Sequence, residues 1–228
     1  MTTAILVTTF NRPSALERSL PQIARLGAPV LVVDDGSVTR WTRELEKCAI
    51  ADYLYVPRNR GLAAAMNIGL SYWLADKDVR WISYFQDDVD VHPKMLEILS
   101  RFQKYSQVLT GHDAGEHRAH KESVVDGVSI KDKWAIRATH VHASASFWRD
   151  MMPIPTRELG APKRQGLGRG LGSDVDWWFV RDSPKSSQKT NRPVLCVPGL
   201  VRSFLYKAED SCWNNPQKAG EEPPLKEW

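Results

Sequence analysis

The hydrophobic positions of the first hundred residues change period in a repeated order. Residues 4–10 form a continuous apolar and β-branched run, which is the pattern of a strand buried on both faces of a parallel sheet. Pro13 and Ser14 then open a segment whose apolar residues recur at helical spacing until Gly27. The same order returns further along the chain. The pattern predicts strands at 4–10, 30–33, 53–56 and 81–85, and helices at 13–26, 62–74 and 93–105.

Strands and helices that alternate in this way predict right-handed β-α-β units, and therefore an α/β fold with a mainly parallel, twisted sheet and helices on both faces. The length of 228 residues suits one elaborated domain rather than two. After residue 108 the pattern becomes irregular, and the last residues have the composition of a loop. We expect a single domain with halves at 1–107 and 108–212, and a tail at 213–228.

An acidic pair follows the second predicted strand, at the edge where ligands bind such sheets. Asp34 and Asp35 stand there, directly before Gly36 and Ser37. A carboxylate at this turn can accept hydrogen bonds from a nucleotide base or from a ribose hydroxyl. An Asx turn or a helix cap would use the same residue types, so both interpretations stand.

A second acidic cluster, Gln86-Asp87-Asp88-Val89-Asp90, follows the predicted strand at 81–85. Three carboxylates within four positions at the end of a buried strand need a positive partner. Mn²⁺ and Mg²⁺ are hard cations that take oxygen ligands, keep several waters and bridge one or two carboxylates to phosphates. The cluster therefore predicts a site for one of these ions, and a solvated acidic turn is the alternative.

These motifs resemble those of the GT-A fold, Rossmann-like glycosyltransferases of family 2. Residues 8–12, Thr-Thr-Phe-Asn-Arg, are similar to the family's opening strand-end motif, and residues 33–37 match its nucleotide-binding D-D-G-S. Residues 59–69 resemble its N-x-G-x-x-x-A-x-N-x-G helix. The resemblance implies an inverting glycosyltransferase whose donor is a nucleoside diphosphate sugar, with UDP as the default nucleotide. Residues 1–107 would be the half that binds this donor.

The resemblance also implies which residues hold the donor. The Gly-rich loop at 166–172 adds one arginine to them, because a loop that closes over the site can bring a cation to the diphosphate. The predicted donor-binding residues are Thr8, Thr9, Phe10, Arg12, Asp34, Asp35, Asn59, Gly61, Asn67, Gln86, Asp87 and Arg169.

Alignment with the family's D-x-D-D motif and its downstream proline places Gln86 at the first aspartate and Asp88 at the metal-contacting one. Asp88 is therefore the first predicted metal ligand and Asp90 the second, with 88–90 as the alternative register of the motif. The family often supplies a late histidine to the metal, where this chain has Ser203. The candidates to replace that ligand are His140 and His142.

Residues 172–178 resemble the family's E-D-x-D segment at the start of a helix. This resemblance implies that Asp174 is the general base, which takes the proton of the acceptor hydroxyl as its oxygen attacks the anomeric carbon. Asp176, Trp177 and Trp178 follow it and are the predicted acceptor-binding residues of the half at 108–212. Asp174 could instead cap the helix that begins there.

Charge and composition bear on the acceptor and the location. The net charge is +4, and residues 157–192 carry eight Lys or Arg against four Asp or Glu. An anionic acceptor such as DNA with a hydroxylated base, flipped from its stack, therefore stands beside glycan and lipid-linked acceptors. No apolar stretch reaches the roughly 20 residues of a membrane span, and three widely spaced cysteines suit reduced thiols. We expect a cytoplasmic enzyme without a transmembrane anchor.

Two other classes of protein fit parts of the sequence. Gln86, Ser173 and Ser203 depart from the resembled family, which would suit a nucleotide-sugar-binding protein with impaired catalysis. A nucleotidyltransferase could use a related α/β sheet. It normally has a Gly-rich, basic phosphate loop after the first strand, and residues 8–13 offer none.

Overall fold

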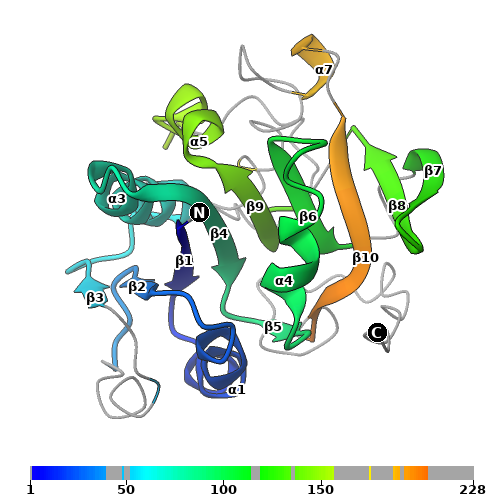
Figure 1. Ribbon diagram of the computed structural model, residues 1–228. Helices are drawn as coiled ribbons and strands as arrows, with labels where there is room; N and C mark the ends of the chain where they lie inside the picture. The colour runs from blue at the N-terminus through cyan, green and yellow to red at the C-terminus, as the bar shows by residue number, and fades with distance from the viewer. Residues whose placement is uncertain are drawn as a thin grey trace, which may run out of the picture.

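The computed structural model describes residues 2–39, 48, 52–113, 119–134, 137–156, 175, 187–190 and 193–204. Within them, ten strands form one continuous sheet in the order β3-β2-β1-β4-β9-β6-β10-β8-β7, and β5 pairs with β10 (Figure 1). The strands are β1 (Thr2–Thr9), β2 (Val30–Asp34), β3 (Asp52–Tyr55), β4 (Val79–Gln86), β5 (Val89–Val91), β6 (Val108–His112), β7 (Ala119–Val125), β8 (Val128–Lys133), β9 (His140–Ser144) and β10 (Val194–Ser203). The helices are α1 (Pro13–Ala24), α3 (Leu62–Ala75), α4 (Met95–Ser100), α5 (Ala145–Met151) and α7 (Ser187–Thr190). Among the helices described, none has the length and apolar content that crossing a membrane requires.

The first half of the sheet is parallel, as predicted. β1 pairs in parallel with β2 and with β4, and β2 pairs in parallel with β3. The apolar centre of β1, from Ala4 to Val7, is completely buried because helices cover both faces of the sheet. The predicted elements of this half are confirmed, except that α4 ends at Ser100 and the chain continues to Tyr105 as turns. The α/β fold class with a mainly parallel central sheet is therefore confirmed.

The half expected to be irregular adds five strands, β6 to β10, to the same sheet, together with the described helices α5 and α7. β9 is antiparallel to β4 and β6, and β10 is parallel to β6, so the sheet is mixed beyond β4. β7 and β8 form a hairpin at the outer edge, where most side chains of β7 are exposed or half-buried. Their sequence therefore lacks the apolar run of a buried strand. Asp126 and Gly127, with φ of 52° and 77°, form the hairpin turn, and an Asp-Gly pair is the local signal that could have revealed it.

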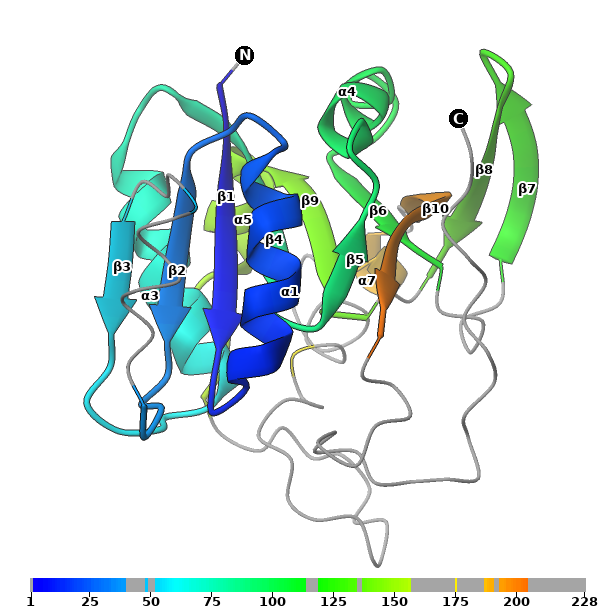
Figure 2. The ribbon, with the colours of Figure 1, turned by 90° about the horizontal axis from the view of Figure 1, so that it is seen from below.

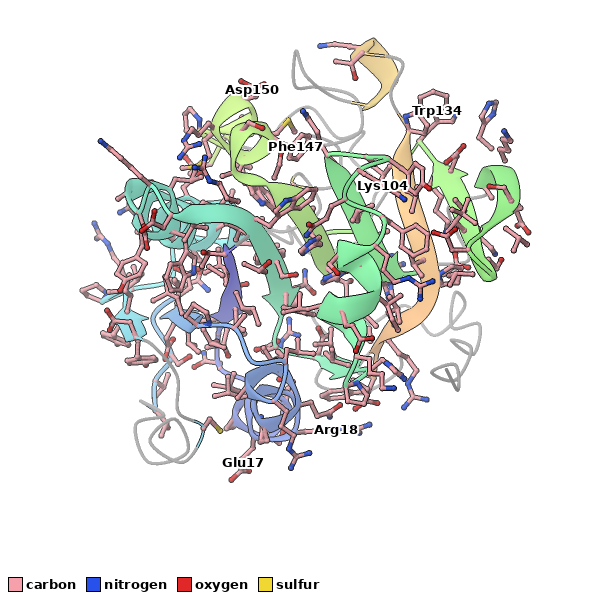
Figure 3. All side chains as sticks on the ribbon, viewed as in Figure 1. Glu17, Arg18, Lys104, Trp134, Phe147 and Asp150 are labelled. Atoms are coloured by element: carbon pink, nitrogen blue, oxygen red, sulfur yellow. The ribbon has the colours of Figure 1, made fainter. Side chains whose placement is uncertain are left out.

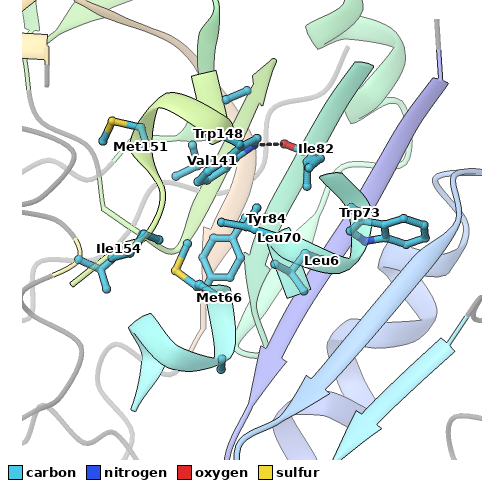
Figure 4. Close-up of a cluster of buried hydrophobic side chains, with 14 of the residues drawn as sticks. Leu6, Met66, Leu70, Trp73, Ile82, Tyr84, Val141, Trp148, Met151 and Ile154 are labelled. Carbon is cyan, nitrogen blue, oxygen red and sulfur yellow. Dashed lines mark hydrogen bonds between the residues drawn. The ribbon is translucent and has the colours of Figure 1, made fainter. Parts of the chain in front are cut away.

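The apolar core lies in two layers, one on each face of the sheet. α1 and α4 contribute to one layer, and α3 and α5 contribute to the other (Figure 2). Trp148 of α5 is completely buried in the second layer, and its Nε1 donates a hydrogen bond of 3.1 Å to the carbonyl of Ile82 on β4 (Figure 4). Trp73 of α3 bonds the carbonyl of Ile5 on β1 in the same way, at 2.9 Å. These contacts fix the helices on the strands whose ends form the candidate site.

Gly69 lets α3 pack closely on β1. A Cβ atom built on Gly69 would lie 2.1 Å from Cδ1 of Leu6, which is completely buried. We expect Gly69→Ala to lower the free energy of unfolding by about 1–3 kcal/mol, because an extra methyl group in a packed core forces its neighbours apart. Urea unfolding would measure the change. Ser71→Ala, at an exposed position of the same helix, is the matched control and should leave stability unchanged or slightly raised.

Candidate functional site at the carboxyl edge of the sheet

The carboxyl ends of β1, β2 and β4 lie at one edge of the sheet, because these strands are parallel neighbours (Figure 2). In register, Thr9 faces Asp34, and Thr8 faces Gln86. β10 ends at the same edge, since it pairs antiparallel with β5 and places Ser203 opposite Val89. The fold therefore brings together the strand-end motifs that the sequence predicts to bind a ligand.

The turn between β4 and β5 carries two buried carboxylates. Asp87 accepts a hydrogen bond of 2.7 Å from the Thr9 hydroxyl and one of 3.2 Å from Nη1 of Arg12. The same nitrogen of Arg12 lies 3.4 Å from Oδ2 of Asp88. Burial raises the pKa of Asp87 to about 7, the positive charge of Arg12 opposes this rise, and the Asp88 carboxylate adds to it. One guanidinium thus serves two carboxylates, an arrangement that favours a further cation or a proton at this turn.

Asp88 has spare capacity to bind such a cation. Its Oδ1 atom is buried and has no hydrogen-bond partner among the described residues. Its Oδ2 atom accepts a hydrogen bond of 3.3 Å from Ser203, and its backbone oxygen accepts one of 3.0 Å from the amide of Phe204. Ser203, which stands in place of the late histidine of the resembled family, therefore lies directly beside Asp88. A buried carboxylate oxygen without a partner is costly, so the site suits an oxygen-seeking ion.

Asp90 lies in a different environment from Asp87 and Asp88. Arg18 of α1 binds both of its oxygens, at 2.9 and 2.6 Å, and Gln22 and Arg202 donate to it at 3.2 and 2.5 Å. The Arg18 guanidinium also stacks over the ring of Phe204, 4.0 Å from its centroid. Sequence reasoning missed both arginines, because they lie 72 and 112 positions from Asp90 and no local pattern marks them. Asp90 therefore ties α1 to β5 and β10, and its oxygens already have four donated hydrogen bonds.

This ion-pair cluster predicts a pH-dependent contribution to stability. Burial raises the pKa of Asp90, but the hydrogen bonds from Arg202, Arg18 and Gln22 outweigh it and leave the pKa lowered. A lowered pKa means that the stabilisation is present above the unfolded-state pKa of about 3.9 and is lost as the pH falls through the folded-state value. We expect Asp90→Asn to reduce the free energy of unfolding by about 1–3 kcal/mol at pH 7. The loss should be smaller than for a fully buried ion pair, because Arg18 and Arg202 are partly exposed.

Urea unfolding between pH 7 and pH 2 would test this prediction. The difference between wild type and Asp90→Asn should shrink as the pH falls below about 4. Asp150→Asn is the matched control, because Asp150 is exposed on α5, far from Arg18 (Figure 3). A loss that stays constant over this range would contradict an electrostatic origin.

The acidic pair after β2 builds the neighbouring loop. Asp34 is completely buried, and its two oxygens accept hydrogen bonds of 2.8 Å from the Ser37 amide and from the Tyr53 hydroxyl. Asp35 accepts hydrogen bonds from two backbone amides, Arg60 at 2.9 Å and Gly61 at 2.7 Å. Burial raises the pKa of Asp35, although these two hydrogen bonds oppose the rise. Asp34 therefore forms the Asx turn that the sequence left open, and Asp35 positions the start of α3.

Two glycines allow this close approach of the two loops. Gly36 has φ of 84°, and a Cβ there would lie 2.5 Å from the backbone of Arg58 and Asn59. Gly61 has φ of 89° directly before α3. Asn59 accepts a further hydrogen bond of 3.0 Å from the Gly61 amide. The D-D-G-S turn and the loop at 58–61 therefore pack backbone against backbone at the edge of the sheet.

Four other predicted donor-binding residues have defined surroundings. The Asn67 amide group bonds both backbone groups of Ile154, at 2.7 and 2.8 Å, and so anchors the segment after α5 to α3. Thr8 contacts the Tyr84 hydroxyl at 2.9 Å and is buried. Phe10, at the end of β1, is 38% exposed and therefore offers an aromatic ring at the site. Gln86, at the end of β4, is half-buried, and its backbone amide bonds the carbonyl of Thr139.

The two candidate histidines are core residues of β9. His142 stacks on Trp81 with ring centroids 4.9 Å apart, and its nitrogens contact Ser83 and Gln103. His140 packs against Phe85 and accepts a hydrogen bond from the amide of Gly111. Burial lowers the pKa of His142 to about 3 and that of His140 well below its usual range. Across the described part of the chain, no three His, Cys, Asp or Glu side chains form a metal-binding group.

The predicted catalytic and acceptor residues, Asp174, Asp176, Trp177 and Trp178, lie outside the described residues, as do Arg169 and the tail at 213–228. Val175 is described, and it is 1% exposed in the core layer that contains α3 and α5. Of the basic segment at 157–192, the described residues are 175 and 187–190.

Comparison with known proteins identifies the kind of domain to which this edge belongs. Residues 4–117 match the family model described as Glycosyl transferase family 2. The match covers 114 of the 228 residues, which is half of the chain. It includes both acidic clusters and ends just after β6. No curated protein sequence matches the chain significantly.

Solved structures with the same fold include S. aureus TarS. The fragment TarS 1–349 is 17% identical with a TM-score of 0.53, over 71% of this chain and 52% of that one. The same fragment in complex with UDP-GlcNAc is 17% identical with a TM-score of 0.50, over 66% and 47%. A longer TarS structure is 14% identical with a TM-score of 0.58, over 87% and 35%. The chain thus spans about half the length of TarS 1–349, and at these identities the likeness shows the fold alone.

Proposed function

Because the chain belongs to glycosyl transferase family 2, we propose that it transfers a sugar from a nucleoside diphosphate donor to an acceptor hydroxyl, with inversion and with the help of a divalent cation. The observation that carries the proposal is the pair of buried carboxylates at the end of β4, of which Asp88 keeps an unpartnered oxygen. It lies at the strand edge where α/β sheets bind nucleotides.

The residues at this turn fit Mn²⁺ or Mg²⁺. Both ions take carboxylate oxygens and complete their shells with water and substrate phosphates, so a single protein carboxylate can suffice. Asp88 would hold the ion, whereas Asp90 is bound by Arg18, Gln22 and Arg202 and belongs to the framework. When bound, the cation would neutralise the charge that develops on the leaving diphosphate.

The donor would lie across the ends of β1, β2 and β4. Asp35 keeps a second lone pair on each carboxylate oxygen for a nucleotide hydroxyl or base N–H. The exposed ring of Phe10 offers a stacking surface for the base. Asp34 and Thr8 shape the site through buried contacts, and Asn67 does so through a half-buried one. The residues proposed to contact the donor are Thr9, Phe10, Arg12, Asp35, Asn59, Gly61, Gln86, Asp87 and, from outside the described residues, Arg169.

Asp174 is proposed to be the general base. Its carboxylate would take the proton of the acceptor hydroxyl while the hydroxyl oxygen bonds to the anomeric carbon and the bond from that carbon to the diphosphate breaks. A single displacement of this kind inverts the configuration. The next residue in the sequence, Val175, supports the proposal, because it is buried in the core layer that also contains residues of β4.

The donor and the metal can be tested together. A thermal-shift panel of nucleotide sugars, with and without Mn²⁺, should show one donor that raises the melting temperature, and more strongly with the ion, because ligands of the native state stabilise it. UDP-GlcNAc is the first donor to test, since S. aureus TarS has been crystallised with it. If no nucleotide sugar raises the melting temperature under either condition, the donor site is wrongly assigned.

Two further measurements separate the alternatives. A donor that binds but is neither hydrolysed nor transferred would indicate a nucleotide-sugar-binding protein, and release of pyrophosphate from a nucleoside triphosphate would indicate a nucleotidyltransferase. For the acceptor, binding to duplex DNA that weakens steeply with salt would favour a nucleic acid over a glycan or a lipid-linked sugar, because phosphate contacts release counterions.

A further inference from the structure

Arg12 occupies the position in which a cation would neutralise the acidic turn. Its Nη1 atom lies 3.2 Å from Oδ1 of Asp87 and 3.4 Å from Oδ2 of Asp88. The Arg12 side chain is 23% exposed, whereas those of Asp87 and Asp88 are 3% and 11% exposed. The guanidinium is therefore the accessible member of a group whose carboxylates are fixed in the interior.

Both carboxylates also accept hydrogen bonds from residues other than Arg12. The Thr9 hydroxyl bonds Oδ2 of Asp87 at 2.7 Å, and the Ser203 hydroxyl bonds Oδ2 of Asp88 at 3.3 Å. Arg12 is the residue directly before α1, and its side chain does not cap that helix. Removing the guanidinium from the turn would therefore leave both carboxylates in place.

We propose that Arg12 is a placeholder for the divalent cation: it neutralises Asp87 and Asp88 while the donor is absent, and moves onto the diphosphate when metal and donor bind together. This proposal rests on the proposed function. A divalent ion that binds without the donor would lie within a few ångströms of the positive charge of Arg12, and the repulsion between the two charges would weaken its binding. The donor diphosphate removes that repulsion, because its oxygens accept both the ion and the planar guanidinium. Arg12 thus makes metal binding depend on the nucleotide.

The experiment measures Mn²⁺ binding to the full chain, with and without UDP, by the electron paramagnetic resonance of the free ion. For wild type we expect weak binding without UDP and much tighter binding with it. For Arg12→Gln we expect Mn²⁺ without UDP to bind about tenfold more tightly than to wild type, since a unit charge at this distance from the ion is removed. In the presence of UDP the same variant should bind Mn²⁺ less tightly than wild type, so the advantage of UDP shrinks.

Arg12→Lys is the matched variant, because it keeps the charge and loses the planar fork. It should resemble wild type without UDP and Arg12→Gln with UDP. A melting temperature near that of wild type for both variants confirms that each is folded.

Equal Mn²⁺ affinity of wild type and Arg12→Gln without UDP would overturn the placeholder role. Mn²⁺ that binds none of the variants, with or without UDP, would instead overturn the metal site of the proposed function. If UDP binds wild type without any metal and loses that binding in Arg12→Gln, Arg12 replaces the ion permanently and the placeholder role is wrong.

Discussion

Replacement of Asp88 by asparagine is expected to reduce donor hydrolysis in the presence of Mn²⁺ by about a hundredfold or more, the usual cost of losing one stabilising group at a developing negative charge. Asparagine keeps the size of the side chain and an oxygen for Ser203, but it removes the negative charge and one of the two oxygens. The Oδ1 atom of Asp88 is a buried carboxylate oxygen without a hydrogen-bond partner among the described residues, so the loss falls on the atom assigned to the cation. Release of the sugar from the donor identified by thermal shift, with water as acceptor, would measure it.

Asp90→Asn is the matched control for this prediction. It removes a carboxylate two positions away, on β5, but that carboxylate is bound by Arg18 and Arg202. We expect its hydrolysis rate to stay within a few-fold of wild type at a temperature where it is folded. The reverse result, with Asp90→Asn inactive and Asp88→Asn active, would favour the shifted register of the acidic motif and contradict the assignment of Asp88.

Ser203 offers a gain of function at the same place. Its hydroxyl lies 3.3 Å from Oδ2 of Asp88, so an imidazole introduced there would stand next to the proposed ion. Imidazole nitrogen is a ligand for divalent ions of the first transition row, and it binds those later than Mn²⁺ more strongly than Mn²⁺ itself. We expect Ser203→His to tighten Mn²⁺ binding in the presence of UDP, measured by the same resonance signal. Ser203→Ala, which adds no ligand, is its control.

The sequence predicted which edge of the sheet carries the site, but not which residues there are available to a ligand and which are bound by other side chains. Apolar runs identify β1, β2 and β4 because these strands are buried on both faces, and the parallel pairing follows from the helices between them. Spacing alone treats Asp88 and Asp90 as equivalent. They differ because Arg18 and Arg202 reach Asp90 from distant parts of the chain, a contact that only the assembled sheet creates.

Long-range contacts and exposure also explain why the sequence did not predict the contacts of Asn67 or the strands of the second half of the sheet. A family-like asparagine on α3 suggested a donor contact, whereas its amide group bonds Ile154, 87 positions away. β7 and β8 escaped notice because an edge hairpin is largely exposed and needs no apolar run. Local pattern therefore identifies buried strands and their ends. Long-range polar contacts decide which residues at those ends remain available to a ligand.

Asp35→Ala should both destabilise the protein and abolish its response to the donor. The Asp35 carboxylate accepts hydrogen bonds from the amides of Arg60 and Gly61, and its removal takes this acceptor from the Arg60 amide and leaves the buried Gly61 amide with Asn59 alone. Hydrogen bonds to charged groups are the stronger ones, so we expect a loss of about 2–3 kcal/mol in the free energy of unfolding. For a chain of this length that corresponds to a fall of about 5–10 °C in the melting temperature.

Asp34→Ala separates the structural part of this effect from the binding part. Asp34 also accepts two hydrogen bonds, from the Ser37 amide and the Tyr53 hydroxyl, but it is 0% exposed, whereas Asp35 is 4% exposed. Both variants should therefore melt at a lower temperature than wild type. Only Asp35→Ala should then show no further rise when the donor and Mn²⁺ are added, measured relative to its own melting temperature without ligand. A full donor-induced rise in Asp35→Ala would mean that the nucleotide does not contact the end of β2, and the donor would have to be placed elsewhere along the edge.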